Sequence, residues 1–527
     1  MKTLKLLSLA TVLFFFNALH AQTPNFDWVR KSSNVNITAT TTDPAGNLFT
    51  SGFYAGTVDF GPGSGVPVFG CSGQTDMVIA KRAHNGQLSW VRHFGGLSYE
   101  QANGLVTDAD GNVYVTGFFN DTVDFGPGPG ITELYSMNDN TFVLKLDSLG
   151  NLVWVKQISS LFENYANSIA ISDHNELVIT GLFGGNTDFN PGSGIDTLNS
   201  IARAMYVLKL DTAGNFIWVK QITSQLFGSS ISSCIADHAG NIVAVGRLIG
   251  TIDLDPGAGV FNLAPLSGTT SSNFILKWDA NGNFKWGHKL DNVDLSLYNG
   301  SLLCDSANNY YMGGGALVGT INLDLTGGVH NITTTVDNYR FVMKVDSDAH
   351  FNWVQQMSDV KSIALDKSGN VYACGTSLRK YQTDGTAQWI IDSSLSKHIT
   401  ICRNSDIYIT GYFSGTVDFN QGSGVDTLSG TNDVFYLKLS QPVLAVPGIS
   451  IRNASPFTVY PNPNNGSFII NCSEDEDYVI TNQLGQIVKS ITTQVGQTGL
   501  ILVEGLPIGY YIITSKNCQS VKVLVSQ

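Results

Sequence analysis

Tryptophan recurs at nearly constant intervals, and this recurrence constrains the fold more than any other feature of the sequence. Each of these tryptophans stands in a short strand-like phrase such as Leu152–Ile158, and repeats of this length are typical of a β-propeller or a β-solenoid. The sequence therefore predicts an all-β body made of one repeated unit. Successive gaps are 62, 64, 64, 68, 67 and 36 residues, between Trp28, Trp90, Trp154, Trp218, Trp286, Trp353 and Trp389.

One repeat contains four strand-like segments. Turn sequences separate the first segment from the second, as in Asp110-Gly111-Asn112, and the third from the fourth, as in Ser148–Asn151. Four antiparallel strands, here called a, b, c and d, make one blade of a propeller. The four segments of this repeat are 102–108, 113–119, 141–147 and 152–158.

The number of b strands in the sequence gives the number of blades. The last blade has no d strand of its own, whereas Phe26–Arg30 is a d-like phrase with no blade before it. We therefore expect a seven-bladed β-propeller whose N-terminal strand completes the last blade and closes the ring, which removes both exposed edges. An open solenoid is the alternative. The expected b strands are Asn47–Tyr54, Asn112–Phe119, Glu176–Phe183, Asn241–Leu248, Asn309–Ala316, Asn370–Ser377 and Asp406–Phe413.

The repeated Asp-x-x-Gly-x-x-x-Trp phrase, as in Asp147, Gly150 and Trp154, has a structural explanation. It resembles the tryptophan-docking motif of quinoprotein propellers with the glycine displaced by one residue. We expect Asp and Gly to form the c–d turn and Trp to pack one blade against another.

The N-terminus predicts export. Lys2 and Lys5 precede an apolar stretch, Leu6–Phe16, and a small-residue cut site follows at Ala21. That stretch is too short to span a bilayer, and no other segment is long enough, so no transmembrane segment is expected. The expected domains are a signal peptide at 1–21, the propeller at 22–440, a linker at 441–455 and a separate domain at 456–527.

Strands and turns alternate in 456–527, which predicts a small C-terminal β-sandwich. The segment opens with Tyr460-Pro461-Asn462-Pro463, continues with Leu484-Gly485-Gln486 and contains Leu506–Thr514. These residues resemble the type A C-terminal sorting domain of type IX secretion cargo, although the terminal strand is only weakly basic, with Lys516 and Lys522. An additional β-sandwich binding module is the alternative.

The resemblance of 456–527 implies a Gram-negative bacterium and passage through the outer membrane by the type IX machinery. It also implies removal of the domain, followed by attachment to surface lipopolysaccharide or release. The body resembles bacterial β-propeller repeat proteins through phrases such as Gly111–Gly117 and Phe142–Gly150. That family has no single activity.

Composition excludes some classes of function. The net charge is −13 and no basic patch exists, so nucleic acid is not an expected partner. No zinc-protease, nucleophile-elbow or phosphate-loop motif occurs, so no catalytic residue is predicted. The cysteine spacings fit no zinc pattern, and Cys472 and Cys518 could form a disulfide.

Six similar glycine-rich loops connect strands b and c, and blade six lacks one. Carbonyl groups at their Pro-Gly turns together with a carboxylate could bind calcium, which predicts metal sites at these aspartates. Alternatively Phe60, Phe125, Phe189 and Phe419 pin each loop to its blade while the aspartate caps a turn. The equivalent residues are Asp59, Asp124, Asp188, Asp253 and Asp418, with Asn322 in the sixth loop.

These features favour one class of function. We expect an exported protein, at the cell surface or released, that binds or adheres to a glycan or protein through the loop-bearing face without catalysis. A polysaccharide-active hydrolase or lyase and a structural surface-layer component are the alternatives.

Overall fold

The computed structural model describes residues 23–441 and 458–526, apart from short gaps. The chain divides into two compact units, 1–441 and 442–527. The expected signal peptide, the linker from 442 to 455, Cys518 and the side chain of Cys472 lie outside the described residues. The gaps are 62–67, 129, 224–227, 268, 296–301, 335–338, 393–394, 421, 423, 463, 473–477, 483–485, 492–498 and 516–519.

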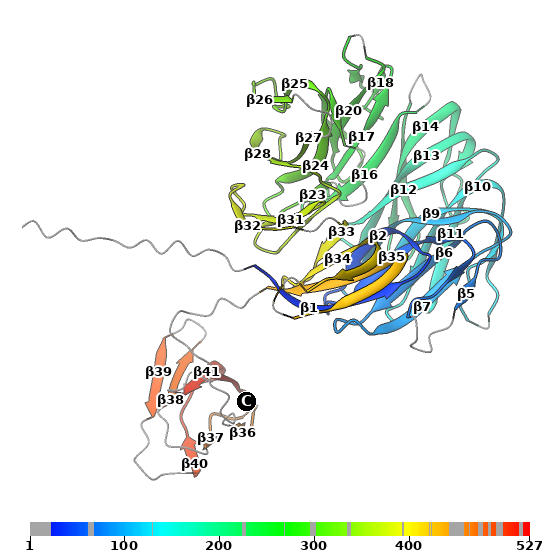
Figure 1. Cartoon of the computed structure of the whole chain (residues 1–527). Coiled ribbons are helices and arrows are strands. Elements are labelled where there is room, and N and C mark those ends of the chain that lie inside the picture. The colour runs from blue at the N-terminus through cyan, green and yellow to red at the C-terminus, as the bar shows by residue number, and fades with distance from the viewer. Residues whose placement is uncertain are drawn as a thin grey trace, which may run out of the picture. The chain divides into compact units, whose positions relative to one another are not determined.

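The first unit is a β-propeller body of four-stranded antiparallel blades, and its described residues form no α-helix. Figure 1 shows the blades following one another about a centre, with β2, β12, β16 and β23 on the inner side. Blade 1 contains β2 (Asn36–Thr42), β3 (Leu48–Tyr54), β6 (Asp76–Arg82) and β7 (Leu88–Phe94). Blade 2 contains β8 (Glu100–Thr107), β9 (Val113–Asp124), β10 (Glu133–Leu146) and β11 (Leu152–Ser160). Blade 3 contains β12 (Asn164–Ile171), β13 (Glu176–Asp188), β14 (Thr197–Asp211) and β15 (Phe216–Ile222).

The next three blades repeat this order. Blade 4 contains β16 (Ser230–Ala236), β17 (Ile242–Ile249), β20 (Ser271–Trp278) and β21 (Phe284–Leu290). Blade 5 contains β23 (Leu302–Cys304), β24 (Tyr310–Ala316), β27 (Tyr339–Val345) and β28 (Phe351–Met357), with β22 (Val293–Asp294) also paired to β24. Blade 6 contains β29 (Ser362–Leu365), β30 (Val371–Cys374), β31 (Ser377–Tyr381) and β32 (Ala387–Asp392).

The last blade takes strands from both ends of the body. Its sheet has the order β1-β35-β34-β33, and β1 pairs antiparallel with β35, with Trp28 opposite Lys438. This is the pairing expected from the isolated phrase at 26–30. The four strands are β1 (Asn25–Ser32), β33 (Ser396–Ile401), β34 (Ile407–Asp418) and β35 (Thr427–Ser440).

Hairpin extensions rise from six of the blades between strands b and c. In blades 2, 3 and 7 the two strands simply continue into the extension. In blades 1, 4 and 5 the extension is a separate two-stranded ribbon. The ribbons pair β4 (Thr57–Val58) with β5 (Phe69–Gly70), β18 (Ile252–Asp253) with β19 (Asn262–Leu263), and β25 (Gly319–Asn322) with β26 (Asn331–Thr334).

Blade 6 corrects one expectation from the sequence. The segment 370–377 was predicted as one strand, but β30 ends at Cys374 and β31 begins at Ser377. Residues 375–376 turn the chain directly from strand b into strand c, because this blade has no hairpin extension.

Buried side chains gather between blades rather than within them. Each of the seven clusters in the body joins two blades that are consecutive in the chain, or joins the last blade to the first. One cluster combines Tyr54 and Val78 of blade 1 with Trp28, Tyr408 and Tyr436 of blade 7. Burial of this apolar surface supplies the main attraction between neighbouring blades.

The repeated tryptophans join each blade to the next, as predicted. In five of the seven, the indole nitrogen donates to a carbonyl in the c–d turn of the following blade, whereas the indole nitrogens of Trp286 and Trp389 have no hydrogen-bond partner among the described residues. The pairs are Trp28 to His84 (3.0 Å), Trp90 to Ser148 (3.2 Å), Trp154 to Thr212 (3.2 Å), Trp218 to Ala280 (3.3 Å) and Trp353 to Thr383 (3.0 Å).

The glycine of each c–d turn lies against the indole. Gly150 has φ of +81°, and a Cβ there would lie 2.8 Å from Cδ2 of Trp90. Glycine is required both by this backbone conformation and by the close contact. In blade 5 the equivalent residue is Ala349, at φ of +69°. There the facing Trp286 has an indole nitrogen without a hydrogen-bond partner among the described residues.

The second unit contains two antiparallel sheets. Residues from both sheets, including Phe468, Val503, Tyr478 and Ile513, form one buried cluster. In the described parts of the chain, no helix is long and apolar enough to cross a membrane. One sheet contains β36 (Thr458–Tyr460), β37 (Phe468–Cys472) and β40 (Gly499–Val503), and the other contains β38 (Tyr478–Asn482), β39 (Ile487–Ile491), β41 (Gly509–Ser515) and β42 (Ser520–Val525).

Candidate functional site

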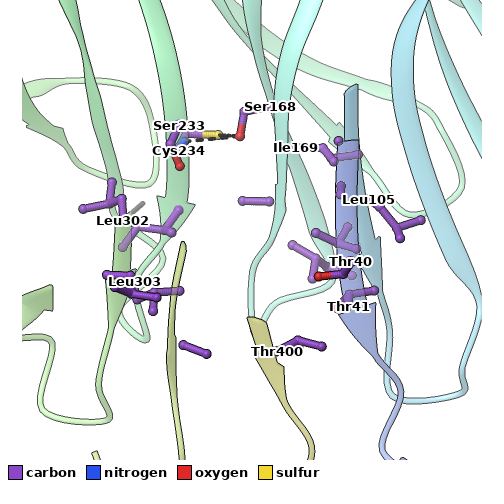
Figure 2. Close-up of a pocket in the computed structure, with 18 of the residues that line it drawn as sticks. Thr40, Thr41, Leu105, Ser168, Ile169, Ser233, Cys234, Leu302, Leu303 and Thr400 are labelled. Atoms are coloured by element: carbon purple, nitrogen blue, oxygen red, sulfur yellow. Dashed lines mark hydrogen bonds between the residues drawn. The ribbon is translucent and has the colours of Figure 1, made fainter. Parts of the chain in front are cut away.

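A cavity of about 400 Å³ runs along the inner strands of the body. Strand a of every blade contributes to its wall, and Figure 2 shows Thr40, Leu105, Ile169, Leu302 and Thr400 around it. Neighbouring inner strands are joined by hydrogen bonds from Thr38 Oγ1 to the Ala102 carbonyl, from Asn103 Nδ2 to Ala166 (2.8 Å) and from Asn167 Nδ2 to Ile231 (3.2 Å).

The cavity wall offers little chemistry. Cys234 and Cys304 carry the only titratable side chains among its described lining residues, and the others are Ala, Gly, Val, Leu, Ile, Ser and Thr. Burial raises the pKa of the Cys234 thiol to about 11 and that of Cys304 to about 12. The Cys234 thiol lies 3.7 Å from Ser168 Oγ, as the dashed line in Figure 2 marks. Because a protonated thiol is a poor nucleophile, this wall provides no general base and no activated nucleophile.

A second cavity, of about 350 Å³, lies at the a–b turns. Asp43, Asp108, Asp173 and Arg403 are among its lining residues. Asp43 accepts hydrogen bonds from the backbone nitrogen (2.8 Å) and the side-chain nitrogen (2.7 Å) of Asn47. Asp108 caps its hairpin turn in the same way, so the carboxylates of Asp43 and Asp108 fix turns, whereas Asp173 Oδ2 lies 2.6 Å from His238 Nδ1.

The five aspartates predicted as calcium sites occupy separate loops. In each loop for which both bonds are described, one side-chain oxygen accepts from the backbone nitrogens two and eight residues further on. Asp124 Oδ1 accepts from Gly126 and Thr132, each at 2.8 Å, and Asn322 Oδ1 makes the equivalent pair of bonds. Asp188, Asp253 and Asp418 make the same pair, and Asp59 accepts from Gly61.

This geometry matches the turn-capping alternative, and the calcium hypothesis stays a prediction. Among the residues that the structure describes, no group of three or more His, Cys, Asp or Glu side chains is placed to hold a metal ion.

Each hairpin extension also contributes to the contact between two blades. Phe60, Phe125, Phe189 and Phe419 are buried, and Phe125 stacks on Phe94 of the preceding blade with ring centroids 5.9 Å apart. Leu254 and Leu323 occupy the same position in blades 4 and 5. The loops are therefore anchored between neighbouring blades, and not only on their own blade as the sequence suggested.

Exposed apolar side chains concentrate at one set of loops. Among the exposed large apolar residues in the described part of the body, all but four lie in the b–c extensions or the d–a loops, and those four are Leu149, Val153, Ile217 and Ile390. The exposed members include Leu97, Tyr99, Ile131, Tyr135, Met137, Leu161, Phe162, Ile195, Ile201, Val260, Val329 and Val425.

Glu100 is an unusual group that the sequence did not reveal. Its side chain is buried at the start of β8, where Oε2 accepts from the Gly96 nitrogen (3.0 Å) and Oε1 has no hydrogen-bond partner among the described residues. Burial raises its pKa to about 7. At the equivalent position of blade 3, Asn164 Oδ1 accepts a hydrogen bond from Thr141 Oγ1 (2.9 Å). A comparison of the first residue of strand a in these two blades would have identified Glu100 from the sequence.

Comparison with known proteins identifies the tail. Residues 458–526 match the family model described as the secretion system C-terminal sorting domain. The body is a β-propeller, and the tail is a type IX secretion sorting domain. The tail indicates a protein secreted by that system, either extracellular or at the cell surface.

The body is similar to other proteins at low sequence identity. An uncharacterized WD repeat-containing protein, L264 of Acanthamoeba polyphaga mimivirus, is 26% identical over 313 residues, which are 49% of this chain and 22% of the relative. The chain thus spans about a fifth of that relative's length. The quinohemoprotein alcohol dehydrogenase of Comamonas testosteroni aligns with a TM-score of 0.41 and 8% identity, covering 82% of this chain and 79% of the enzyme. BamB of Moraxella catarrhalis aligns with a TM-score of 0.34 and 10% identity, covering 78% and 100%.

Proposed function

We propose that this chain is an exported β-propeller protein, displayed on the cell surface or released, that binds a glycan or protein without catalysis through its d–a and b–c loops. The observation that carries the proposal is the concentration of exposed apolar side chains on those loops. Apolar side chains that gather on one set of loops are a feature of surfaces that contact a partner.

A closed ring of seven blades and a β-sandwich tail are part of this proposal. Three observations support the ring: the pairing of β1 with β35, the bond from Trp28 to His84, and the bond from Tyr408 Oη to the Gly46 carbonyl (2.7 Å). The cavity lined by strand a of all seven blades supports it as well. The single core shared by the two sheets of the tail supports the sandwich.

The hairpin tips are suited to repeated contacts. An aliphatic residue follows the glycine-rich turn in each described tip, and its exposed fraction lies between 73% and 80%. Several identical weak contacts on one body multiply into strong attachment through avidity. The five residues are Ile131, Ile195, Val260, Val329 and Val425.

Export would place this face outside the cell. The sorting tail would engage the type IX machinery, and its removal would leave the propeller attached to surface lipopolysaccharide or free. Deletion of 458–526 in a type IX-competent host should retain the protein inside the cell, as measured by fractionation. Secretion of the deleted form at the normal level would contradict the assigned route.

Binding is tested with the purified full-length chain on an array of bacterial and host-type oligosaccharides and on immobilised bacterial surface proteins. We expect a specific signal that falls at least tenfold in the triple variant Ile131→Ser, Ile195→Ser, Val425→Ser. The matched control, Leu149→Ser, Ile217→Ser, Ile390→Ser, removes exposed apolar residues away from those loops and should bind normally. No signal on either surface, or equal loss in both variants, would overturn the proposal.

A further inference from the structure

A cavity lined by basic side chains lies where blade 7 meets blade 1, and it is called here the blade 7–1 cavity. Its volume is about 610 Å³. Strand β1 of blade 7 supplies one wall, and the c–d turn and the hairpin extension of blade 1 supply others. Arg30, Lys31 and Arg82 line it, whereas none of its described lining residues is acidic. This is unusual in a chain whose net charge is −13.

Arg82 is the basic residue that the repeat does not explain. It is the last residue of strand c in blade 1 and is only 4% exposed. Its guanidinium lies over the ring of Tyr436, 4.4 Å from the centroid. The other blades have an apolar residue or a tyrosine at this position: Leu146, Leu210, Trp278, Val345, Tyr381 and Leu439.

The Arg82 guanidinium is bonded to neutral oxygens. Nη2 donates to the Phe60 carbonyl (2.7 Å) and to Ser32 Oγ (3.3 Å), and Nη1 donates to the Gly86 carbonyl (3.4 Å). In the described part of the chain, Nε has no hydrogen-bond partner and Arg82 forms no ion pair. Burial lowers the pKa of Arg82, and the charge of Arg30 lowers it further. A buried cation without a counterion is costly to desolvate, so an anion beside it would be stabilising.

In the contact between blades 1 and 2, the arginine of strand d meets a carboxylate. Arg92 Nε donates to the Gly150 carbonyl in the c–d turn of blade 2 (2.8 Å). Burial lowers the pKa of Arg92, and the charge of Asp147 in that turn opposes the shift. An aspartate begins the same turn in blades 2 to 5, at Asp147, Asp211, Asp279 and Asp346.

Arg30 occupies the position of Arg92 in blade 7, but the turn opposite it begins with Ala83. The Gly86 carbonyl of this turn accepts from Arg82. The hydrogen bond described for the Arg30 side chain goes to the carbonyl of its own neighbour, Val29 (2.8 Å). The cavity therefore has two guanidinium groups and lacks the carboxylate that the repeat places in this turn elsewhere.

Carboxylates on the neighbouring segments have other partners. Asp433 pairs with Lys31 (2.8 Å), which removes the third cation of the cavity. Asp59 accepts from the backbone nitrogen two residues further on (2.9 Å), and Asp426 accepts from Asn420 Nδ2 (2.7 Å). In the described part of the chain, no carboxylate oxygen lies within 4.0 Å of a guanidinium nitrogen of either arginine of the cavity.

We propose that the blade 7–1 cavity binds an oxyanion, that is, a carboxylate, sulfate or phosphate group, beside Arg30 and Arg82. A guanidinium group presents parallel N–H donors whose geometry matches the oxygens of such a group. The anion takes the place of the carboxylate that Asp147 supplies in the next contact. The volume lies within the range of small-molecule sites, so a molecule of monosaccharide size can carry the group. The inference does not depend on what the b–c and d–a loops bind.

The test uses the purified full-length chain and isothermal titration calorimetry. The probes are sulfate, inorganic phosphate and glucuronate, and galactose is the uncharged control. Sodium chloride keeps the ionic strength constant, so that general screening does not differ between probes. We expect at least one of the three anions to bind and galactose not to bind. The probe that binds most tightly distinguishes a sulfate or phosphate group from a carboxylate on a sugar.

Two variants test the location of the site. Ala83→Asp restores the carboxylate that four other blades have in this turn, and it should weaken anion binding by about tenfold or more because the new charge competes with the ligand. Arg30→Gln should weaken binding about tenfold, which corresponds to the loss of one charge-assisted hydrogen bond. Arg92→Gln is the matched control, because this equivalent arginine already faces Asp147, and it should bind as wild type does.

A cooperative thermal unfolding transition establishes that each variant is folded. Absence of binding by all three anions would overturn the proposal. Unchanged binding in Ala83→Asp or in Arg30→Gln would also overturn it. An equal loss in Arg92→Gln would do the same, because binding would then follow the overall charge of the protein and not this cavity.

Discussion

The contact between blades 1 and 2 differs from the contact between blades 5 and 6, although both join consecutive repeats. In the first, Phe125 from the hairpin extension is fully buried beside Phe94 and Phe142. In the second, blade 6 has no extension, and Val360 from the d–a loop lies in the smaller buried cluster. The repeated loop is therefore part of the packing between blades wherever it occurs.

This difference explains why the loops are so similar to one another. In four of the six loops a phenylalanine fills the gap between blades and in the other two a leucine fills it, while an aspartate or asparagine closes a turn of constant length. Uniform loop sequence follows from packing and requires no common ligand. Distinctive recognition is expected where the repeat changes.

The largest expected effect comes from removing the loop phenylalanine. Phe125→Ala should lower the free energy of unfolding by about 3–5 kcal/mol, because it leaves a cavity in a tightly packed contact. Val360→Ala in the contact between blades 5 and 6 removes less volume and should cost about 2 kcal/mol or less. Urea unfolding of both variants measures the difference. Equal costs would show that the extension is dispensable for packing.

Glu100 distinguishes two positions that are otherwise equivalent in blades 2 and 3. Its pKa is raised from 4.5 to about 7, so the folded protein retains a proton that the unfolded chain releases between these values. The contribution of Glu100 to stability is therefore complete below pH 4.5 and falls by about 3 kcal/mol as pH rises through 7. This is the sign for a group whose folded pKa is raised.

The variant Glu100→Gln carries a permanently neutral side chain. It should lose this part of the pH dependence and be more stable than wild type at pH 8. Glu133→Gln, on an exposed carboxyl group, is the matched control. Unfolding midpoints of the wild type and both variants at pH 5 and pH 8 test this prediction. If Glu100→Gln shows the same change in midpoint between the two pH values as the wild type, that change belongs to another titratable group.

Two glycines with the same backbone conformation differ in whether they contact a tryptophan. Gly150 has φ of +81° and faces Trp90, whereas Gly415 has φ of +80° and no atom within 4 Å of the position of a Cβ. Alanine at either position incurs about 1–2 kcal/mol of backbone strain. Overlap with the indole should add about 1–3 kcal/mol at Gly150 only. Equal thermal midpoints would mean that the turn moves away from the indole without cost.

The sequence predicted the body better than it predicted the site. Tryptophan spacing and turn residues indicated the strands of the blades because these patterns report local backbone geometry and burial. The isolated phrase at 26–30 even indicated the partner of β35. The state of Glu100 and the neighbours of Arg82 depend on atoms from distant segments, which no local pattern records. Blade 6 was misread at 375–376 because a short turn between two apolar strands resembles a continuous strand.

The smallest effect is expected at the repeated aspartates. Asn322 makes the same two backbone bonds in blade 5 that Asp124 makes in blade 2, so an amide oxygen already fulfils this role. Asp124→Asn should change the free energy of unfolding by less than about 0.5 kcal/mol when calcium is absent. The substitution retains both hydrogen bonds and removes no buried contact, because the turn is exposed.

The variant Asp124→Asn also tests whether the carboxylate binds calcium. If the carboxylate also binds the ion, calcium must stabilise wild type by mass action and must stabilise Asp124→Asn less. Thermal unfolding with calcium, and then with excess chelator, measures this difference directly. Equal midpoints in all four conditions would leave the aspartates with turn capping alone. A calcium-dependent rise confined to wild type would make the extensions metal sites and would add a ligand requirement to the hairpin tips.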